Sequence, residues 1–207
     1  MKKLFLGAAI AMSSLTFAQQ FGVKAGMNVS SMSKDEGLSD QGSKIGFNAG
    51  VFMNAPIAEN FSIQPELLFS QYGEKYDYTV PATVVTPETR YSGATHLDYV
   101  TVPVMFQYNV IPNLYLEAGP EFGLLINAKD KYKNETTGET ISESGDFKDD
   151  LNTFNFGLGL GAGYYFTENI GLTARYVAGF TDIAKDRPSG SDAVKNNVFQ
   201  VGLAYKF

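Results

Sequence analysis

The sequence predicts an all-β fold: an eight-stranded antiparallel up-and-down transmembrane β-barrel, preceded by a cleaved signal peptide. The first observation behind this prediction is strict alternation. Apolar residues occupy every second position over 154–166 and again over 170–180, which is the period of an extended strand. The second is that the positions between them run mainly as glycine from Gly157 to Gly163, and such a face builds no ordinary core. We therefore expect the apolar face to contact lipid and the other face to line a narrow lumen.

The third observation is that the alternation recurs in eight stretches of about ten to thirteen residues, near the length of roughly 9–11 residues that a tilted membrane strand needs. The connections between the stretches are alternately long and short, which is typical of outer-membrane barrels. The expected long connections are residues 32–43, 73–95, 127–152 and 181–195.

The first four strands follow from this pattern in order. The first and second, 21–31 and 44–55, each place five apolar residues on one face and mainly glycines or polar residues on the other. The third, 61–72, also alternates but contains Pro65, which lacks an N–H for the ladder and predicts a bulge or distortion. The fourth, 97–108, carries valines and aromatic residues on its apolar face.

The last four strands complete the pattern. The fifth is 114–126, and the sixth and seventh form the hairpin 154–180 with its turn at 167–169. The eighth, 196–207, ends in an aromatic residue. Because the number of strands is even, we expect both termini on the side of the short turns, which is the periplasm.

The N-terminus has the features of a secretory signal. Lys2 and Lys3 precede a short apolar run, and small residues at Thr16 and Ala18 predict cleavage after Ala18. The apolar run is too short to span a bilayer. The expected organisation is therefore a signal peptide at 1–18 and one outer-membrane β-barrel domain at 19–207.

Composition narrows the function classes. The net charge of −6 would fall to −8 on loss of two signal-peptide lysines, which argues against nucleic-acid binding. The chain has no cysteine, so a disulfide, a thiol nucleophile and a thiolate metal site are excluded. We expect a monomer with no cofactor. Its expected partners are outer-membrane lipid and lipopolysaccharide, the barrel-insertion machinery and an unknown surface ligand.

Several runs of residues carry a resemblance to a known family. The runs are Phe21-Gly22-Val23-Lys24-Ala25-Gly26-Met27-Asn28, Tyr99-Val100-Thr101-Val102-Pro103-Val104, Tyr115-Leu116-Glu117-Ala118-Gly119-Pro120, Phe122-Gly123-Leu124-Leu125 and Tyr205-Lys206-Phe207. The mature chain resembles the small outer-membrane β-barrel family of Bacteroidetes that is often described as porin-family or PorT-like. The resemblance implies a barrel in the outer membrane. It extends equally to PorT itself, which is a component of secretion and gliding, and to the paralogues of PorT. Tyr205 and Phe207 are similar to the terminal signal that barrel-insertion machinery reads.

A set of charged residues falls on the lumen-facing side of the expected strands. The set is Lys24, Glu66, Glu117, Glu121, Arg175 and Lys206. An eight-stranded barrel is just wide enough for side chains to fill it, and charges there must pair. Glu66 and Arg175 each lie sixth from the periplasmic end of their strands, which predicts similar depth. Two interpretations remain: a hydrogen-bonded structural plug, or a path for protons or ions.

Other candidate sites are weaker. Glu117 and Glu121 share a strand face at roughly 13 Å, whereas a glycosidase pair needs roughly 5–9.5 Å. His96 with Ser92 and Asp98 could suggest an outer-membrane lipid hydrolase, but no nucleophile elbow surrounds the serine, so we expect a rim histidine. The spacing of the glycines at 157–163 does not fit a phosphate loop, because no helix start or lysine follows.

The connection at 127–152 is rich in acidic residues. They are Asp130, Glu135, Glu139, Glu143, Asp146, Asp149 and Asp150. Their spacing is not that of an EF-hand loop, and lysines lie among them, so we expect a solvated loop, with a weak divalent site or lipopolysaccharide bridging as the alternative.

Three function classes follow. The first is a non-enzymatic structural or surface-interaction protein that uses its long loops. The second is porin-like passive transport of small solutes or ions, or a PorT-like accessory role in secretion. The third, more remote, is a lipid-modifying enzyme of the outer membrane.

Overall fold

The computed structural model describes five segments of the chain. They are residues 19–33, 40–82, 87–141, 147–185 and 192–207. The expected signal peptide at 1–18 lies outside the described residues and stays a prediction. Within the described segments, no helix is long and apolar enough to cross a membrane.

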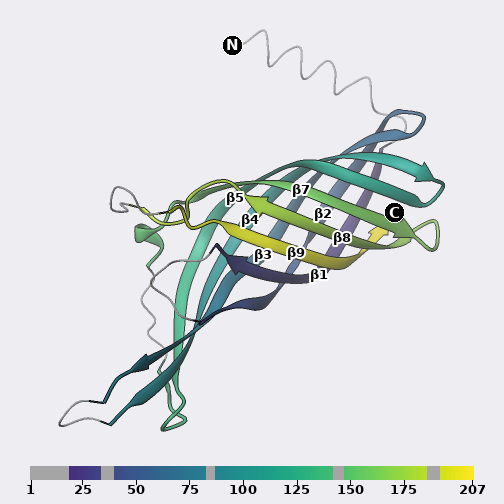
Figure 1. The fold of residues 1–207 in the computed structure, drawn as a ribbon. Coiled ribbons are helices and arrows are strands. Elements are labelled where there is room, and N and C mark those ends of the chain that lie inside the picture. Colours follow the sequence, from purple (N-terminus) through teal and green to yellow (C-terminus); the bar gives the residue numbers. More distant parts are fainter. Residues whose placement is uncertain (1–18, 34–39, 83–86, 142–146, 186–191) are drawn as a thin grey trace.

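Eight strands close into a single antiparallel ring (Figure 1). They are β1 (Gln20–Met32), β2 (Asp40–Ala58), β3 (Phe61–Val80), β4 (Thr89–Ile111), β5 (Leu114–Asn134), β7 (Phe154–Tyr165), β8 (Ile170–Gly179) and β9 (Asn196–Lys206). Each pairs with its neighbours in sequence, and β1 pairs with β9 to complete the circuit. The predicted eight-stranded up-and-down barrel is confirmed. The short strand β6 (Thr140–Ile141) pairs with the far end of β5, and one 3-10 turn, η1 (Lys148–Asp150), follows it.

The alternating apolar residues lie on the outside of the ring. Leu160 is 69% exposed, and Leu158 and Tyr176 are about half exposed. Large apolar side chains are exposed in the same way on all eight strands of the ring. An apolar outer wall of this extent matches hydrocarbon rather than water, as the alternation predicted.

The lumen holds more apolar bulk than the sequence analysis expected. Mainly glycine and polar side chains were expected there, together with Met105, Tyr115, Tyr165 and Val177, which the alternation places on the same face, but the inward apolar side chains are more numerous. They are Phe52, Leu68, Tyr72, Leu97, Tyr99, Met105, Tyr115, Leu125, Tyr165, Val177 and Val198. The physical reason is that side chains fill the interior of an eight-stranded barrel. Large side chains on one strand must therefore pack against small residues on another.

The glycines of β7 provide the matching small wall. A Cβ at Gly163 would lie 2.3 Å from the ring of Tyr115, and one at Gly159 would lie 2.9 Å from the terminal methyl group of Met105. The glycine face predicted from the sequence is therefore the surface against which side chains from other strands pack.

Four strands are clearly longer than the alternation predicted. One is β2, which begins at Asp40, inside the expected connection at 32–43, and pairs there with β3. The expected long connection at 73–95 is wrong in most of its length, because β3 and β4 stay paired out to Val80 and Thr89. The expected connection at 127–152 begins with eight further residues of β5. Strands β3, β4 and β5 therefore run well beyond the rest of the ring (Figure 1). We call their residues 73–80, 89–96 and 127–134 the extension. It was missed because one face is basic and the tyrosines of the other face are interrupted by Glu74, Gly93 and Asp130, so no continuous apolar alternation marks it.

Candidate functional site

The middle of the lumen holds an ion-pair network centred on Arg175. Its Nη1 and Nη2 donate to the two oxygens of Glu66 at 3.0 and 2.7 Å, and its Nε donates to Glu117 Oε1 at 2.7 Å. Lys24 Nζ lies 3.3 Å from Glu66 Oε1. Two cations thus meet two carboxylates on four different strands, and the expected common depth of Glu66 and Arg175 matches this contact.

Neutral amides complete the ion-pair network. Gln64 Nε2 donates to Glu66 Oε1 at 2.8 Å, and Gln107 Nε2 donates to Glu117 Oε2 at 3.0 Å. Each side chain here is 5% exposed or less. Buried charges of this kind are stable only when paired and hydrogen-bonded, and both conditions hold.

The other two residues of the expected charged set lie apart from this network. Glu121 accepts a hydrogen bond from the Tyr72 hydroxyl at 2.6 Å, and its Oε2 has no partner among the described residues. Lys206 lies at the short-turn end, where its Nζ is 3.6 Å from the centre of the Tyr165 ring. The structure therefore brings four of the six residues together.

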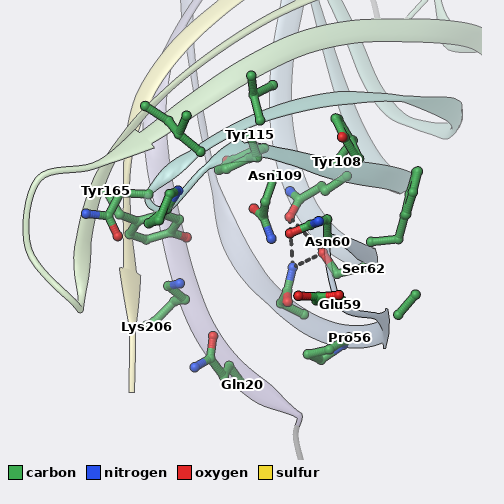
Figure 2. Close-up of a pocket in the computed structure, with 18 of the residues that line it drawn as sticks. Gln20, Pro56, Glu59, Asn60, Ser62, Tyr108, Asn109, Tyr115, Tyr165 and Lys206 are labelled. Atoms are coloured by element: carbon green, nitrogen blue, oxygen red, sulfur yellow. Dashed lines mark hydrogen bonds between the residues drawn. The ribbon is translucent and has the colours of Figure 1, made fainter.

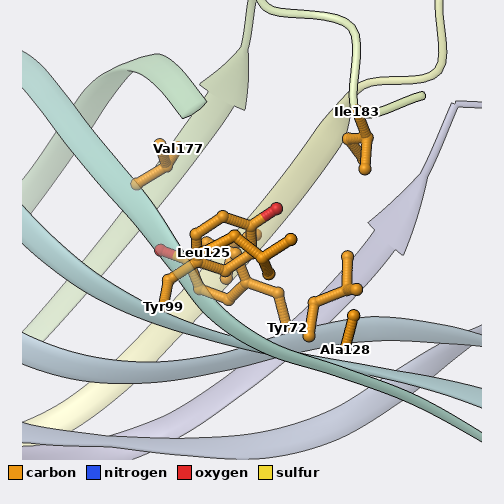
Figure 3. Close-up of a cluster of buried hydrophobic side chains, with 8 residues drawn as sticks. Tyr72, Tyr99, Leu125, Ala128, Val177 and Ile183 are labelled. Atoms are coloured by element: carbon orange, nitrogen blue, oxygen red, sulfur yellow. The ribbon is translucent and has the colours of Figure 1, made fainter. Parts of the chain in front are cut away.

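An apolar cluster lies in the long-loop end of the lumen (Figure 3). Tyr72, Tyr99 and Leu125 extend into it from the strands, and Ile183 covers it from the connection after β8. Phe147, Leu151, Val194 and Met32 pack around it. Because this plug contains loop residues, no strand periodicity could have predicted it.

The short-turn end opens into a cavity of about 790 Å³ (Figure 2). Its floor is polar: Asn54 Nδ2 donates to Ser62 Oγ at 3.0 Å and to Gln107 Oε1 at 2.8 Å. Tyr115 and Tyr165 line its inner wall. The cavity ends at this floor, with the ion-pair network and the apolar cluster beyond it.

The two faces of the extension differ in chemistry. One face continues the lumen side and carries four tyrosines: Tyr76, Tyr78, Tyr91 and Tyr132. The Tyr78 and Tyr91 rings stack at 5.1 Å, and Tyr132 meets Tyr76 and Tyr78 edge-on at 6.1 and 6.4 Å. These contacts hold the three strands together outside the barrel.

The opposite face of the extension is basic. Its cations are Lys75, Arg90, Lys129, Lys131 and Lys133, all exposed. The sequence analysis missed this face, although a signal was present: three lysines at alternate positions, 129, 131 and 133, are the period of a strand face.

His96 lies on the basic face with Ser92 and Asp98. Ser92 and His96 are four residues apart on one strand, or roughly 13 Å, too far for a nucleophile and its base. Asp98 instead accepts hydrogen bonds from Gln71 at 3.1 Å and from Asn127 at 2.8 Å. This arrangement matches the rim position expected for the histidine.

The acidic residues of 127–152 are dispersed. Asp130 accepts a hydrogen bond from Thr95 at 2.7 Å, and Glu135 pairs with Lys133 at 3.2 Å. Glu143 and Asp146 lie outside the described residues. Among the residues that the structure does describe, no group of three or more potential metal ligands occurs.

The C-terminal aromatic residues face outward at the short-turn end. Tyr205 and Phe207 are 43% and 73% exposed, and their rings are 5.5 Å apart. The last backbone N–H, of Phe207, donates to Phe21 O at 2.9 Å, which fastens the chain end to β1.

Comparison with known proteins places this architecture in a family. The family model for the outer membrane protein beta-barrel domain matches residues 17–185, so the chain belongs to that family of outer-membrane proteins. Among solved structures, the attachment invasion locus protein Ail of Yersinia pestis is 16% identical with a TM-score of 0.50, covering 92% of this chain and 100% of that one. Neisserial surface protein A is 15% identical with a TM-score of 0.48, covering 92% and 99%. These likenesses concern the fold alone. No curated protein sequence matches the chain.

Proposed function

We propose that this protein is a closed, non-enzymatic outer-membrane barrel that binds a surface ligand through the extension. The observation that carries the proposal is the filled lumen. Among the described residues, the ion-pair network and the apolar cluster occupy successive levels of the lumen, which supports a closed barrel. The sheet outside the barrel, by contrast, presents exposed side chains on both faces.

The proposed orientation places the short turns and both termini in the periplasm and the extension outside the cell. The lengths of the connections support it, because outer-membrane barrels have short periplasmic turns and longer extracellular segments. The turn between β2 and β3 spans only Glu59 and Asn60, whereas β3 and β4 reach far past the apolar wall. In this orientation Tyr205 and Phe207 lie where barrel-insertion machinery would meet them.

The tyrosine face is the proposed contact for the ligand. Tyrosine offers a large, rigid surface with a polar tip, which suits recognition at low entropic cost. The rings of Tyr76, Tyr78 and Tyr132 are each only partly buried, so they remain accessible to a partner. The proposed unit is a monomer in the membrane.

The test compares binding of whole cells that carry the protein to glycan and peptide arrays. Cells with the wild-type protein should bind array spots that cells without it do not bind. The double variant Tyr78→Ser with Tyr91→Ser should lose this additional binding. Tyr78→Phe with Tyr91→Phe keeps the rings and should retain most of it. Identical array profiles for wild type, the serine variant and empty cells would overturn the proposal.

A further inference from the structure

The basic face of the extension has three cations without an ion-pair partner among the described residues: Lys75, Lys129 and Lys131. The other two are partly neutralised, because Arg90 lies 3.6 Å from Asp77 and Lys133 lies 3.2 Å from Glu135. A protein with a net charge of −6 thus gathers uncompensated positive charge at one place on its surface.

The register of the strands brings these cations close together. Lys75 pairs with Ala94, and Ala94 pairs with Lys131, so the two lysines lie in one row, two strands or roughly 10 Å apart. Lys129 precedes Lys131 on the same face, roughly 7 Å along the strand. Three ammonium groups therefore border one patch of sheet.

This patch continues the lipid-facing wall of the barrel. Leu97 and Ala128 pair with each other and are buried on the lumen side. His96 and Lys129 are their chain neighbours and must point the other way, toward the membrane side. Below them on β5 lie Leu124 and Ile126, which are 54% and 46% exposed. Lys129 follows Ile126 by three residues, or roughly 10 Å, about the depth of a headgroup layer.

His96 lies above the apolar wall, next to the patch. The pKa of His96 is lowered by burial and then by the charges of Lys44 and Lys131. Asp98 opposes this shift more weakly.

We propose that Lys75, Lys129 and Lys131 bind the phosphate groups of the phosphorylated glycolipid of the surrounding outer leaflet, with its acyl chains against Leu124 and Ile126. The inference rests on the proposed orientation of the extension. Ammonium groups bind phosphate as point charges, and an anionic surface attracts cations placed directly above an apolar wall. A soluble polyanion would account for the lysines but not for their alignment with that wall.

The test uses the whole mature protein, refolded in zwitterionic detergent micelles, with bis-phosphorylated lipid A as the probe. Binding is followed by the rise in the unfolding midpoint and by co-elution with the protein. Lys75→Gln, Lys129→Gln and Lys131→Gln together should weaken the apparent Kd at least about tenfold, because each cation near an anionic lipid surface contributes about one kcal/mol.

The matched control removes three cations from loops at the same end of the barrel: Lys148→Gln, Lys185→Gln and Lys195→Gln. It changes the net charge equally and should keep the apparent Kd within about twofold of wild type. Lys131→Gln alone, a milder change, should show a partial loss. Each sample is checked for a closed barrel by the difference between heated and unheated mobility on a gel.

Further arms separate the sources of anion. Lipid A without phosphate should bind more weakly to wild type, and inorganic phosphate at the same concentration should not compete. Equal affinity of wild type and the triple variant for bis-phosphorylated lipid A overturns the proposal. So does strong binding of a heparin oligosaccharide without binding of lipid A, which would identify a soluble polyanion as the partner. These measurements in micelles do not depend on the array signals, so the failure of one proposal is distinguishable from that of the other.

Discussion

At the level of single residues, Arg175 is the main partner of the two carboxylates that are buried in the middle of this barrel. Its planar guanidinium reaches Glu66 with two nitrogens and Glu117 with the third, at 2.7 to 3.0 Å. A lysine could not reproduce this fork, because it presents one point charge. The geometry leaves each carboxylate with a further donor of its own, Gln64 for one and Gln107 for the other.

Replacing Arg175 by alanine should lower the free energy of unfolding by about 3–5 kcal/mol, because two buried carboxylates then lose their main partner. Urea unfolding of the refolded protein in micelles measures the change. Arg90→Ala removes a surface pair in which the arginine is 62% exposed, and should cost at most about 1 kcal/mol. Equal midpoints for the two variants would contradict a stabilising role for the network.

Gly50 is a second residue at which the close packing of the barrel can be tested. A Cβ there would lie 2.0 Å from the backbone oxygen of Leu67, so β2 and β3 would have to separate. Gly50→Ala should therefore destabilise the protein by about 1–3 kcal/mol in the same unfolding measurement. Gly42→Ala on the same strand meets nothing closer than 3.8 Å and serves as the control. A loss as large at Gly42 would show that strand propensity, not close approach, is responsible.

At the level of elements, the extension is a sheet that leaves the barrel while keeping its strand pairing. It begins at Gly73, whose φ of +136° favours glycine. A Cβ at this position would lie 1.9 Å from the backbone oxygen of Thr95, so no larger residue fits. Beyond this point the apolar wall ends, while the strands stay paired and the rings of Tyr78 and Tyr91 stack across β3 and β4. The element thus presents two usable faces, one aromatic and one basic.

The orientation of the elements can be tested by labelling single cysteines, because the chain has none of its own. Thr137→Cys lies beyond the far end of β5, and Glu59→Cys lies in the short turn between β2 and β3. A membrane-impermeant maleimide applied to intact cells should modify the first and not the second.

Permeabilising the outer membrane should then expose the second cysteine to the reagent. This step shows that the short-turn site is reactive and only shielded. The reverse pattern of labelling would place the extension in the periplasm and would remove the basis for both proposals.

At the level of the whole molecule, side chains of the described residues fill the lumen at successive levels. The ion-pair network lies between the polar cavity at the short-turn end and the apolar cluster at the other end. The three levels draw on residues from every strand of the ring, so the filling of the lumen is a property of the assembled barrel rather than of any one strand.

Purified protein in planar bilayers should therefore show no stepwise conductance. Glu66→Ala combined with Arg175→Ala should also stay closed, because the cluster around Tyr72, Tyr99 and Leu125 remains in place. A known porin, recorded in the same membranes, controls for insertion. Discrete steps from the wild-type protein would favour passive transport instead.

The sequence alone determined the strand number, the antiparallel order and the side of each strand that meets lipid. These features depend on local alternation, which the backbone of an extended strand imposes wherever it lies. The same alternation identified Glu66 and Arg175 as inward-facing. It failed at 40–43, at 73–95 and over the first part of 127–152, because the few aromatic residues there are interrupted on their own face by polar residues or glycine.

Only the tertiary structure decided which inward side chains meet. Arg175 joins Glu66 across 109 positions of sequence, Gly163 accommodates Tyr115, and Ile183 folds over the open end. These contacts depend both on the register of every strand pair and on closure of the ring. A local sequence pattern contains neither kind of information. For the same reason Lys75 and Lys131 became one basic patch only once β4 had aligned β3 with β5.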